Sequence, residues 1–177
     1  MTLNLPDLTL AYALNDNGDH PDGGHCVGLP ADDADRWKLL LDQHLLAFGE
    51  VADRGRELLD TTGDGWSLTR PVLFAAHHTC EVAIKFALVT NTGNTGPKSH
   101  KLDQLWARLR STGGTARLSA NEVGWVDDFI AEMQKLTTQG FDGRYPDTQG
   151  DMSEQWCCLR VPALQSAVTT FVALMQR

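Results

Sequence analysis

The stretch Thr69–Val89 reads TRPVLFAAHHTCEVAIKFALV and decides the fold of this chain. Its apolar residues cover more of a helix circumference than one amphipathic stripe needs, so neighbouring segments must pack on several sides. Pro71 suits the first turn of such a helix, where its missing N–H is no loss. The stretch therefore predicts the central helix of a helical bundle.

Polar residues interrupt this helix along one face. Arg70, His77, Glu81 and Lys85 are separated by seven, four and four positions, which places them on the same side. A titratable stripe on an otherwise buried helix is a candidate functional site. The alternative is that this face has only a structural role. A Glu–Lys pair four residues apart stabilises an exposed helix by about 0.2–0.5 kcal/mol. The helix alone fits both interpretations.

Four further helices are expected around the central one. An Asp32 or Asp33 N-cap begins the first, and an S-x-x-E capping box of Ser119 and Glu122 begins the fourth. The chain is therefore expected to be all-α, an up-and-down bundle of four to five helices over residues 33–177, with an irregular acidic arm over residues 1–32. The expected helices run from Asp33 to about Leu59, from Thr69 to Val89, from His100 behind a Ser99 cap to about Arg110, from Ser119 to about Leu136, and from Pro162 to about Met175.

Composition and charge narrow the class of protein. With 42% hydrophobic and 21% charged residues, the 177-residue chain is typical of a soluble globular protein. The start, MTLNLPDLTLAY, lacks the positive region of a secretory signal, and no stretch is expected to span a bilayer, so we expect a cytoplasmic protein.

The net charge of −8 is concentrated in residues 1–60. Residues 70–117 instead carry seven basic and two acidic side chains. Local potential steers an anionic partner, so this segment is a candidate phosphate-binding surface. The alternative is a set of solvated helix faces.

The four cysteines do not have the spacing of a zinc site or a redox motif. Adjacent Cys157 and Cys158 fit a helix core better than a disulfide. A zinc site built from His20, His25 and Cys26 with a distant ligand is not supported by the spacing. We therefore expect no metal and no cofactor.

Arg70 and His77 enclose six residues and lie two turns apart. A neutral imidazole near pH 7 can take a proton from a ribose 2′-hydroxyl, and an arginine can stabilise the charge that develops on the phosphate. His77 is the better general-base candidate, because His78 lies about 100° around the helix from that stripe.

Two later segments add polar groups. Lys98, His100 and Lys101 lie at a predicted helix start, where positive side chains and free N–H groups suit a phosphate. His100 ordering the loop by a hydrogen bond is the favoured alternative. In the loop containing Arg144 and Tyr145, the arginine is expected either to reach back to Glu81 or to remain solvated.

Taken together, three segments resemble the HEPN superfamily (higher eukaryotes and prokaryotes nucleotide-binding domain). The resemblance covers roughly residues 35–176. The segments are HHTCEVAIKFAL with Glu81 and Lys85 as E-x-x-x-K, SHKLDQLWARL with His100 before an apolar-periodic run, and RYP at Arg144–Pro146.

This resemblance implies a bundle that pairs into a homodimer with its cleft between the subunits. Many relatives are metal-independent endoribonucleases with an R-x4-6-H motif, often toxins or phage-defence proteins, and others bind nucleotides or act as scaffolds. In many catalytic relatives the motif lies nearer the C-terminal helices, whereas this sequence has no histidine after His100.

The leading hypothesis is a cytoplasmic dimeric endoribonuclease in which His77 is the general base and Arg70 stabilises the phosphate. Its expected partners are RNA or a nucleotide, and an antitoxin or regulatory protein. The alternative is a non-catalytic HEPN-like module that binds nucleotides or proteins. The residues expected to bind substrate or order the site are His78, Glu81, Lys85, Lys98, His100, Lys101, Arg144 and Tyr145.

Overall fold

The computed structural model describes residues 32–63, 68–138 and 159–177, and these contain five α-helices and no strand. The all-α prediction is confirmed. The predicted arm over residues 1–32 lies outside the described residues except for Asp32 and stays a prediction. The helices are α1 (Asp33–Thr62), α2 (Thr69–Thr92), α3 (Leu102–Ser111), α4 (Ala120–Thr138) and α5 (Val161–Met175).

The helix ends follow local side-chain chemistry. Asp32 caps α1, since its Oδ1 accepts hydrogen bonds from the N–H groups of Ala34 at 2.7 Å and Asp35 at 3.3 Å. The predicted capping box is also present, because the N–H of Ser119 donates to Glu122 Oε2 at 2.8 Å. Helices α1 and α2 both extend three residues beyond their predicted ends.

Gly63 and Gly93 end these two long helices. Their φ angles are 72° and 70°, a left-handed conformation that glycine adopts without the penalty of a Cβ. The N–H of Gly63 bonds to the carbonyl of Leu59, and that of Gly93 bonds to Val89. Each helix continues beyond its last apolar residues until a glycine ends it. The apolar pattern therefore placed both predicted ends three residues too early.

The start of α3 corrects the prediction for His100. The helix begins at Leu102, so His100 lies in the preceding connection rather than in the first turn. Ser99 does not cap the helix; its Oγ accepts from the N–H of Lys101 at 3.1 Å and donates to Gln104 Oε1 at 2.7 Å. Lys101, the residue immediately before the helix, has an extended backbone.

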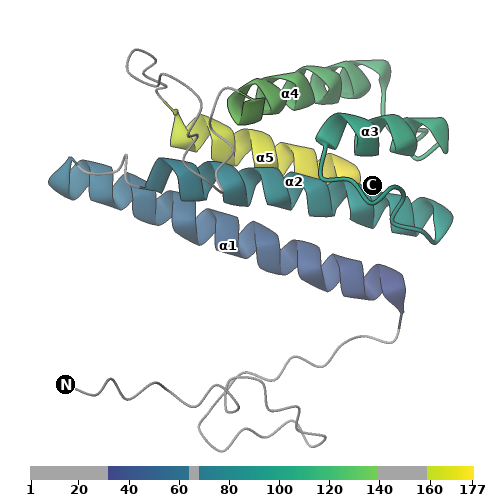
Figure 1. Ribbon diagram of the computed structural model, residues 1–177, viewed down its shortest axis with the longest axis horizontal. Coiled ribbons are helices and arrows are strands. Elements are labelled where there is room, and N and C mark those ends of the chain that lie inside the picture. The colour runs from purple at the N-terminus through teal and green to yellow at the C-terminus, as the bar shows by residue number, and fades with distance from the viewer. Residues whose placement is uncertain (1–31, 64–67, 139–158) are drawn as a thin grey trace, which may run out of the picture. The chain divides into compact units, whose positions relative to one another are not determined.

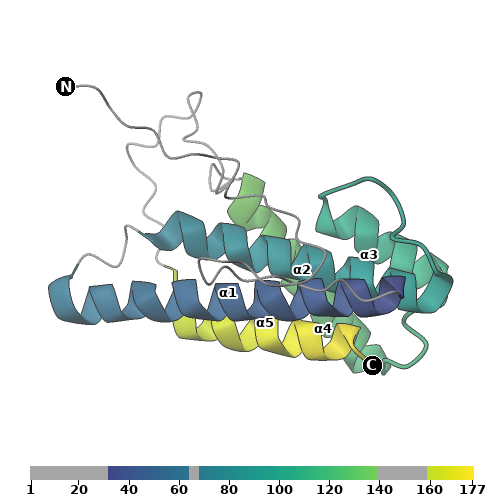
Figure 2. The same ribbon diagram turned by 90° about the horizontal axis from the view of Figure 1, so that it is seen from below.

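Helix α2 is the centre of the bundle, as predicted. It packs against α1, α3 and α5, while α4 contacts α3 and α5. Figures 1 and 2 show α1 and α2 as a long antiparallel pair with α5 alongside. Twelve of the 24 residues of α2 are buried, including residues on opposite sides of the helix.

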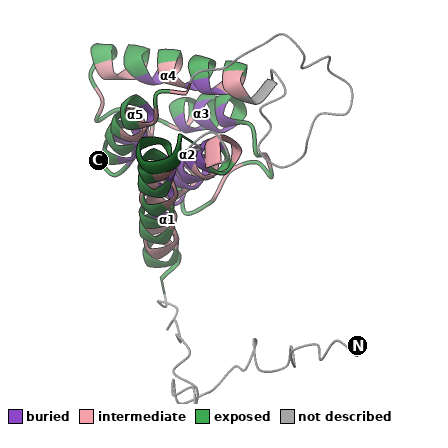
Figure 3. Cartoon of the chain, turned by 90° about the vertical axis from the view of Figure 1, so that its left-hand side faces the viewer, coloured by how far each residue is buried: buried purple, intermediate pink, exposed green. Residues whose placement is uncertain are grey.

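Figure 3 shows the buried residues gathered where the helices face one another. Two large aromatic side chains remain partly exposed: Phe74 is 42% exposed and Trp125 is 36% exposed. Each stacks on an aromatic ring of its own helix, Phe74 on His78 and Trp125 on Phe129. The largest fully buried side chains are Phe48, Phe171, Leu41, Ile84, Leu88, Leu102, Leu105, Leu109 and Met133.

By length and composition, α2 also meets the criteria for a membrane span, with a mean hydropathy of 1.4. From the sequence, no stretch is expected to span a bilayer. Helix α2 meets the criteria because few charged residues fall within its most apolar 18 residues. Of that window, 67% is buried inside the bundle. The apolar surface of α2 is thus covered by the other helices, as in the core helix of a globular fold.

Candidate functional site

Glu81 is the centre of the polar group on α2. Glu81 is only 2% exposed, yet its carboxylate lies close to the polar side chains of His78, Lys85 and His100. Lys85 Nζ lies 2.7 Å from Oε1, and His100 Nδ1 lies 3.0 Å from Oε1 and 3.2 Å from Oε2. The structure therefore joins α2 to the connection before α3 through one buried carboxylate.

The surroundings of Glu81 determine its ionisation. Burial by itself would raise the pKa of this carboxyl, but the polar contacts with His78, Lys85 and His100 and the charge of Lys85 outweigh it, and the pKa falls to about 2. Glu81 is therefore ionised at neutral pH and can only accept hydrogen bonds. It follows that His100 donates through Nδ1, which leaves Nε2 as the atom available for proton transfer.

His78 approaches the same carboxylate from one turn earlier in α2. Its Nδ1 lies 3.6 Å from Glu81 Oε2, too far for a good hydrogen bond but close enough for a charge interaction. The ring is stacked on Phe74, with centroids 5.9 Å apart, and His44 of α1 meets its face edge-on at 4.5 Å. The Glu81 group, defined as His78, Glu81, Lys85 and His100, is thus fixed against α1 as well.

His44 of α1 is a contact of this group that was not among the predicted site residues. Burial, followed by the nearby His78, lowers its pKa against the opposing influence of Glu81. The signal that pointed to it was a histidine within an apolar stripe of α1. Such a residue needs a polar or aromatic partner when the helix packs.

Arg70 and His77 lie on α2 at half-buried positions. His77 is one helical turn before Glu81, so their Cβ atoms are about 5–6 Å apart. Arg70 is two turns further back and forms no hydrogen bond or ion pair with the Glu81 group. The assignment of these two residues as catalytic stays a prediction.

The remaining predicted residues divide into two sets. Lys98 and Lys101 are exposed and flank His100 in the connection before α3. Arg144 and Tyr145 lie outside the described residues, so the proposed reach of Arg144 to Glu81 stays a prediction.

A family model matches the part of the chain that contains Glu81 and His100. The HEPN domain matches residues 66–161, which is more than half of the 177-residue chain. The chain belongs to the HEPN domain family. This family includes ribonucleases of toxin and defence systems, and the domain implies an interaction with RNA or nucleotides. The searches of curated proteins and of solved structures gave no match.

The HEPN match contains α2, α3, α4 and every predicted site residue, and it ends at the first residue of α5. It is narrower than the resemblance over residues 35–176. Helix α1 lies before the match but packs against α2 and contributes His44 beside the Glu81 group. The surroundings of this group therefore extend beyond the matched HEPN segment.

A second acidic group joins α3 to α4 in the HEPN domain. Asp127 Oδ1 accepts a hydrogen bond from Trp106 Nε1 at 2.6 Å and one from Arg110 Nη1 at 3.0 Å. Sequence reasoning missed this Asp127 group, formed by Trp106, Arg110 and Asp127. The available signal was Trp106 in the apolar-periodic run SHKLDQLWARL, because an indole N–H requires an acceptor when it is buried.

In the described part of this HEPN protein, no group of three or more His, Cys, Asp or Glu is arranged to hold a metal ion. Burial raises the pKa of the Cys80 thiol, which disfavours the reactive thiolate. His20, His25, Cys26, Cys157 and Cys158 lie outside the described residues.

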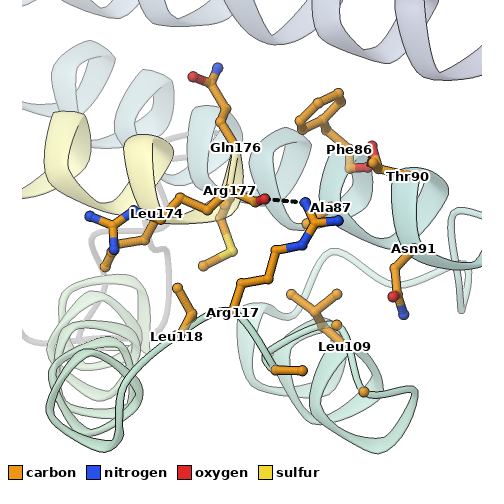
Figure 4. Close-up of a pocket in the computed structure, with 14 residues that line it drawn as sticks. Phe86, Ala87, Thr90, Asn91, Leu109, Arg117, Leu118, Leu174, Gln176 and Arg177 are labelled. Atoms are coloured by element: carbon orange, nitrogen blue, oxygen red, sulfur yellow. Dashed lines mark hydrogen bonds between the residues drawn. The ribbon is translucent and has the colours of Figure 1, made fainter.

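A pocket of about 390 Å³ lies at the opposite end of α2 from Arg70 (Figure 4). It contains none of the predicted site residues. Its two arginines are already engaged, since Arg117 donates to the backbone carbonyl of Arg177 and the Arg177 guanidinium pairs with Glu122. The pocket is lined by Phe86, Ala87, Thr90, Asn91, Leu109, Gly113, Gly114, Ala116, Arg117, Leu118, Leu174, Met175, Gln176 and Arg177.

Proposed function

We propose that this HEPN protein is a metal-independent endoribonuclease of the toxin or phage-defence type. The observation that carries the proposal is the ionised, buried Glu81, which follows His77 by one helical turn and holds the exposed His100 by a hydrogen bond. Histidines fixed beside a carboxylate are suited to proton transfer near neutral pH.

In the proposed reaction, His77 removes the proton from a ribose 2′-hydroxyl, and the 2′-oxygen attacks the adjacent phosphorus. Arg70 stabilises the negative charge that develops on the phosphate. Exposed Lys98 and Lys101 attract the RNA backbone, since positive side chains beside the site raise the local concentration of an anionic substrate. Cleavage follows from these side chains without a metal ion.

The assembly belongs to the same proposal. We place the protein in the cytoplasm as a homodimer whose active cleft is shared between the subunits, and we expect an antitoxin or another regulatory protein to restrain it. The side chain of His100 and the ring of Phe74 are both exposed, so a second chain or RNA can approach each of them.

The test is cleavage of a mixed-sequence RNA by the purified protein in EDTA, at a defined low salt concentration because RNA binding is salt-dependent. The wild type is expected to cut, and His77→Ala and Arg70→Ala are each expected to lose about 10²-fold or more. Arg110→Ala is the matched control, because it removes an arginine that pairs with Asp127 instead. If the wild type leaves the RNA intact, the catalytic proposal is wrong.

The second candidate function is a non-catalytic HEPN module that binds RNA or a nucleotide. The low exposure of Glu81 favours it, because a carboxylate that is 2% exposed also serves as a structural anchor. RNA binding without cleavage, unchanged in His77→Ala and weakened in a Lys98→Ala and Lys101→Ala double variant, would establish this function instead.

A further inference from the structure

The proposed cleavage needs a second proton transfer that His77 does not supply. When the phosphorus–5′-oxygen bond breaks, the departing oxygen needs a proton, which a positioned general acid can deliver. Among the described residues, two imidazoles lie beside the Glu81 carboxylate, which follows His77 by one helical turn; these candidate donors are His78 and His100.

The geometry points to His100 as this general acid, positioned by Glu81. This inference rests on the proposed ribonuclease function. The His100 Nδ1 lies within 3.2 Å of both Glu81 oxygens, so the ring has a defined orientation. Its side chain is 66% exposed, and its Nε2 has no hydrogen-bond partner in the part of the chain that the structure describes. Nε2 is therefore open to a substrate.

His78 is less suited to the role. Its side chain is 36% exposed, and the ring lies between Phe74 and His44, which restricts access to it. Its 3.6 Å approach to Glu81 is also too long to fix a tautomer as the His100 contacts do. His78 therefore packs the site against α1, whereas His100 faces the solvent.

The side chains beside His100 suit an anionic substrate. Lys98 and Lys101 flank it in the connection before α3, and both are exposed. These two lysines draw the phosphate toward Nε2 of His100.

The step balances as a transesterification. His77 accepts the 2′-hydroxyl proton, and a bond forms between the 2′-oxygen and phosphorus. The bond from phosphorus to the 5′-oxygen breaks, its electron pair remains on that oxygen, and His100 Nε2 donates a proton to it. The products are a 2′,3′-cyclic phosphate and a 5′-hydroxyl, and no oxidant, reductant or metal takes part.

The test uses two substrates that differ in their need for a general acid. One is a short RNA, whose 5′-oxygen leaves poorly without a proton; the other is a ribonucleoside 3′-(4-nitrophenyl phosphate), whose aryl oxide leaves without one. His100→Gln in the full chain is expected to lose about 10²–10⁴-fold on RNA and less than about tenfold on the aryl ester. His77→Gln is expected to lose activity on both.

His78→Gln is the matched control, because it changes the other imidazole beside Glu81, and it should leave the ratio of the two activities close to that of the wild type. Circular dichroism and thermal unfolding check that each variant is folded. If wild-type protein cuts RNA but His100→Gln loses the same factor on both substrates, or loses nothing, the general-acid role is wrong while the nuclease stands. The same holds if His78→Gln alone changes the ratio. A wild type that cuts neither substrate overturns the proposed function and this inference with it.

Discussion

The Glu81 group and the Asp127 group both join two segments of the bundle through a carboxylate, but their hydrogen-bond donors differ. Each places one carboxylate between two segments of the bundle and surrounds it with donors. The Glu81 side chain is 3% exposed and meets two histidines and a lysine, whereas Asp127 is 43% exposed and meets an indole and a guanidinium. Imidazoles change protonation near neutral pH, but indole and guanidinium groups do not. The donors therefore mark Glu81 as the group capable of proton chemistry.

Removing the central carboxylate of each group should give the largest difference. We expect Glu81→Ala to lower the free energy of unfolding by about 3–5 kcal/mol, because Lys85, whose side chain is 15% exposed, loses the partner of its buried charge. Urea unfolding at pH 7 measures this, with Glu81→Gln as the control that keeps the size of the side chain. A loss of less than about 1 kcal/mol would show that Glu81 does not anchor the segment before α3.

The pH dependence of stability isolates the charge of Glu81. Burial opposes ionisation, but the polar contacts with His78, Lys85 and His100 lower the pKa of Glu81 from 4.5 to about 2. A lowered pKa in the folded state stabilises the fold above the ordinary pKa, and this stabilisation is lost as the pH falls from about 4.5 toward 2. Thermal unfolding from pH 7 to pH 2 should therefore show a steeper loss for the wild type than for Glu81→Gln. Parallel curves would contradict the assignment.

The Asp127 group should respond more weakly. We expect Asp127→Ala to cost about 1–3 kcal/mol, mainly because the indole N–H of Trp106, a residue that is 4% exposed, loses its acceptor. Urea unfolding beside Trp106→Phe separates the hydrogen bond from the packing of the ring. Since the group contains no imidazole, RNA cleavage should be retained in the folded protein. Loss of cleavage in a folded Asp127 variant would break the distinction between the two groups.

The sequence predicted those features that depend on neighbours along the chain. The Asp32 cap, the Ser119 capping box and the i,i+4 pair of Glu81 and Lys85 all follow from short-range spacing. The burial of α2 followed from its composition. Each of these features needs only the local backbone, so no knowledge of the tertiary structure was required.

Contacts between distant segments were harder to predict. The contact between His100 and Glu81 spans 19 positions, and only the family resemblance grouped these residues before the structure did. Sequence reasoning also placed His100 inside a helix, because Ser99 satisfied the pattern of a cap that the backbone does not use. Asp127 offered no local pattern, because its partners lie 17 and 21 positions away on another helix. Tertiary packing decided these positions.

The smallest expected effect is that of the Arg110–Asp127 ion pair, and it gives the most direct comparison with the Lys85–Glu81 pair. Arg110 and Asp127 form an ion pair with side chains 49% and 43% exposed, and such pairs contribute about 0–1 kcal/mol. A double-mutant cycle with Arg110→Ala and Asp127→Asn should therefore give a coupling energy below about 1 kcal/mol that decreases in 0.5–1 M salt. The same cycle with Lys85→Met and Glu81→Gln should give a larger energy that salt changes little, because those charges are buried. Equal coupling energies would mean that burial does not separate the two groups, and the case for Glu81 as the proton-transfer centre would then rest on its histidines alone.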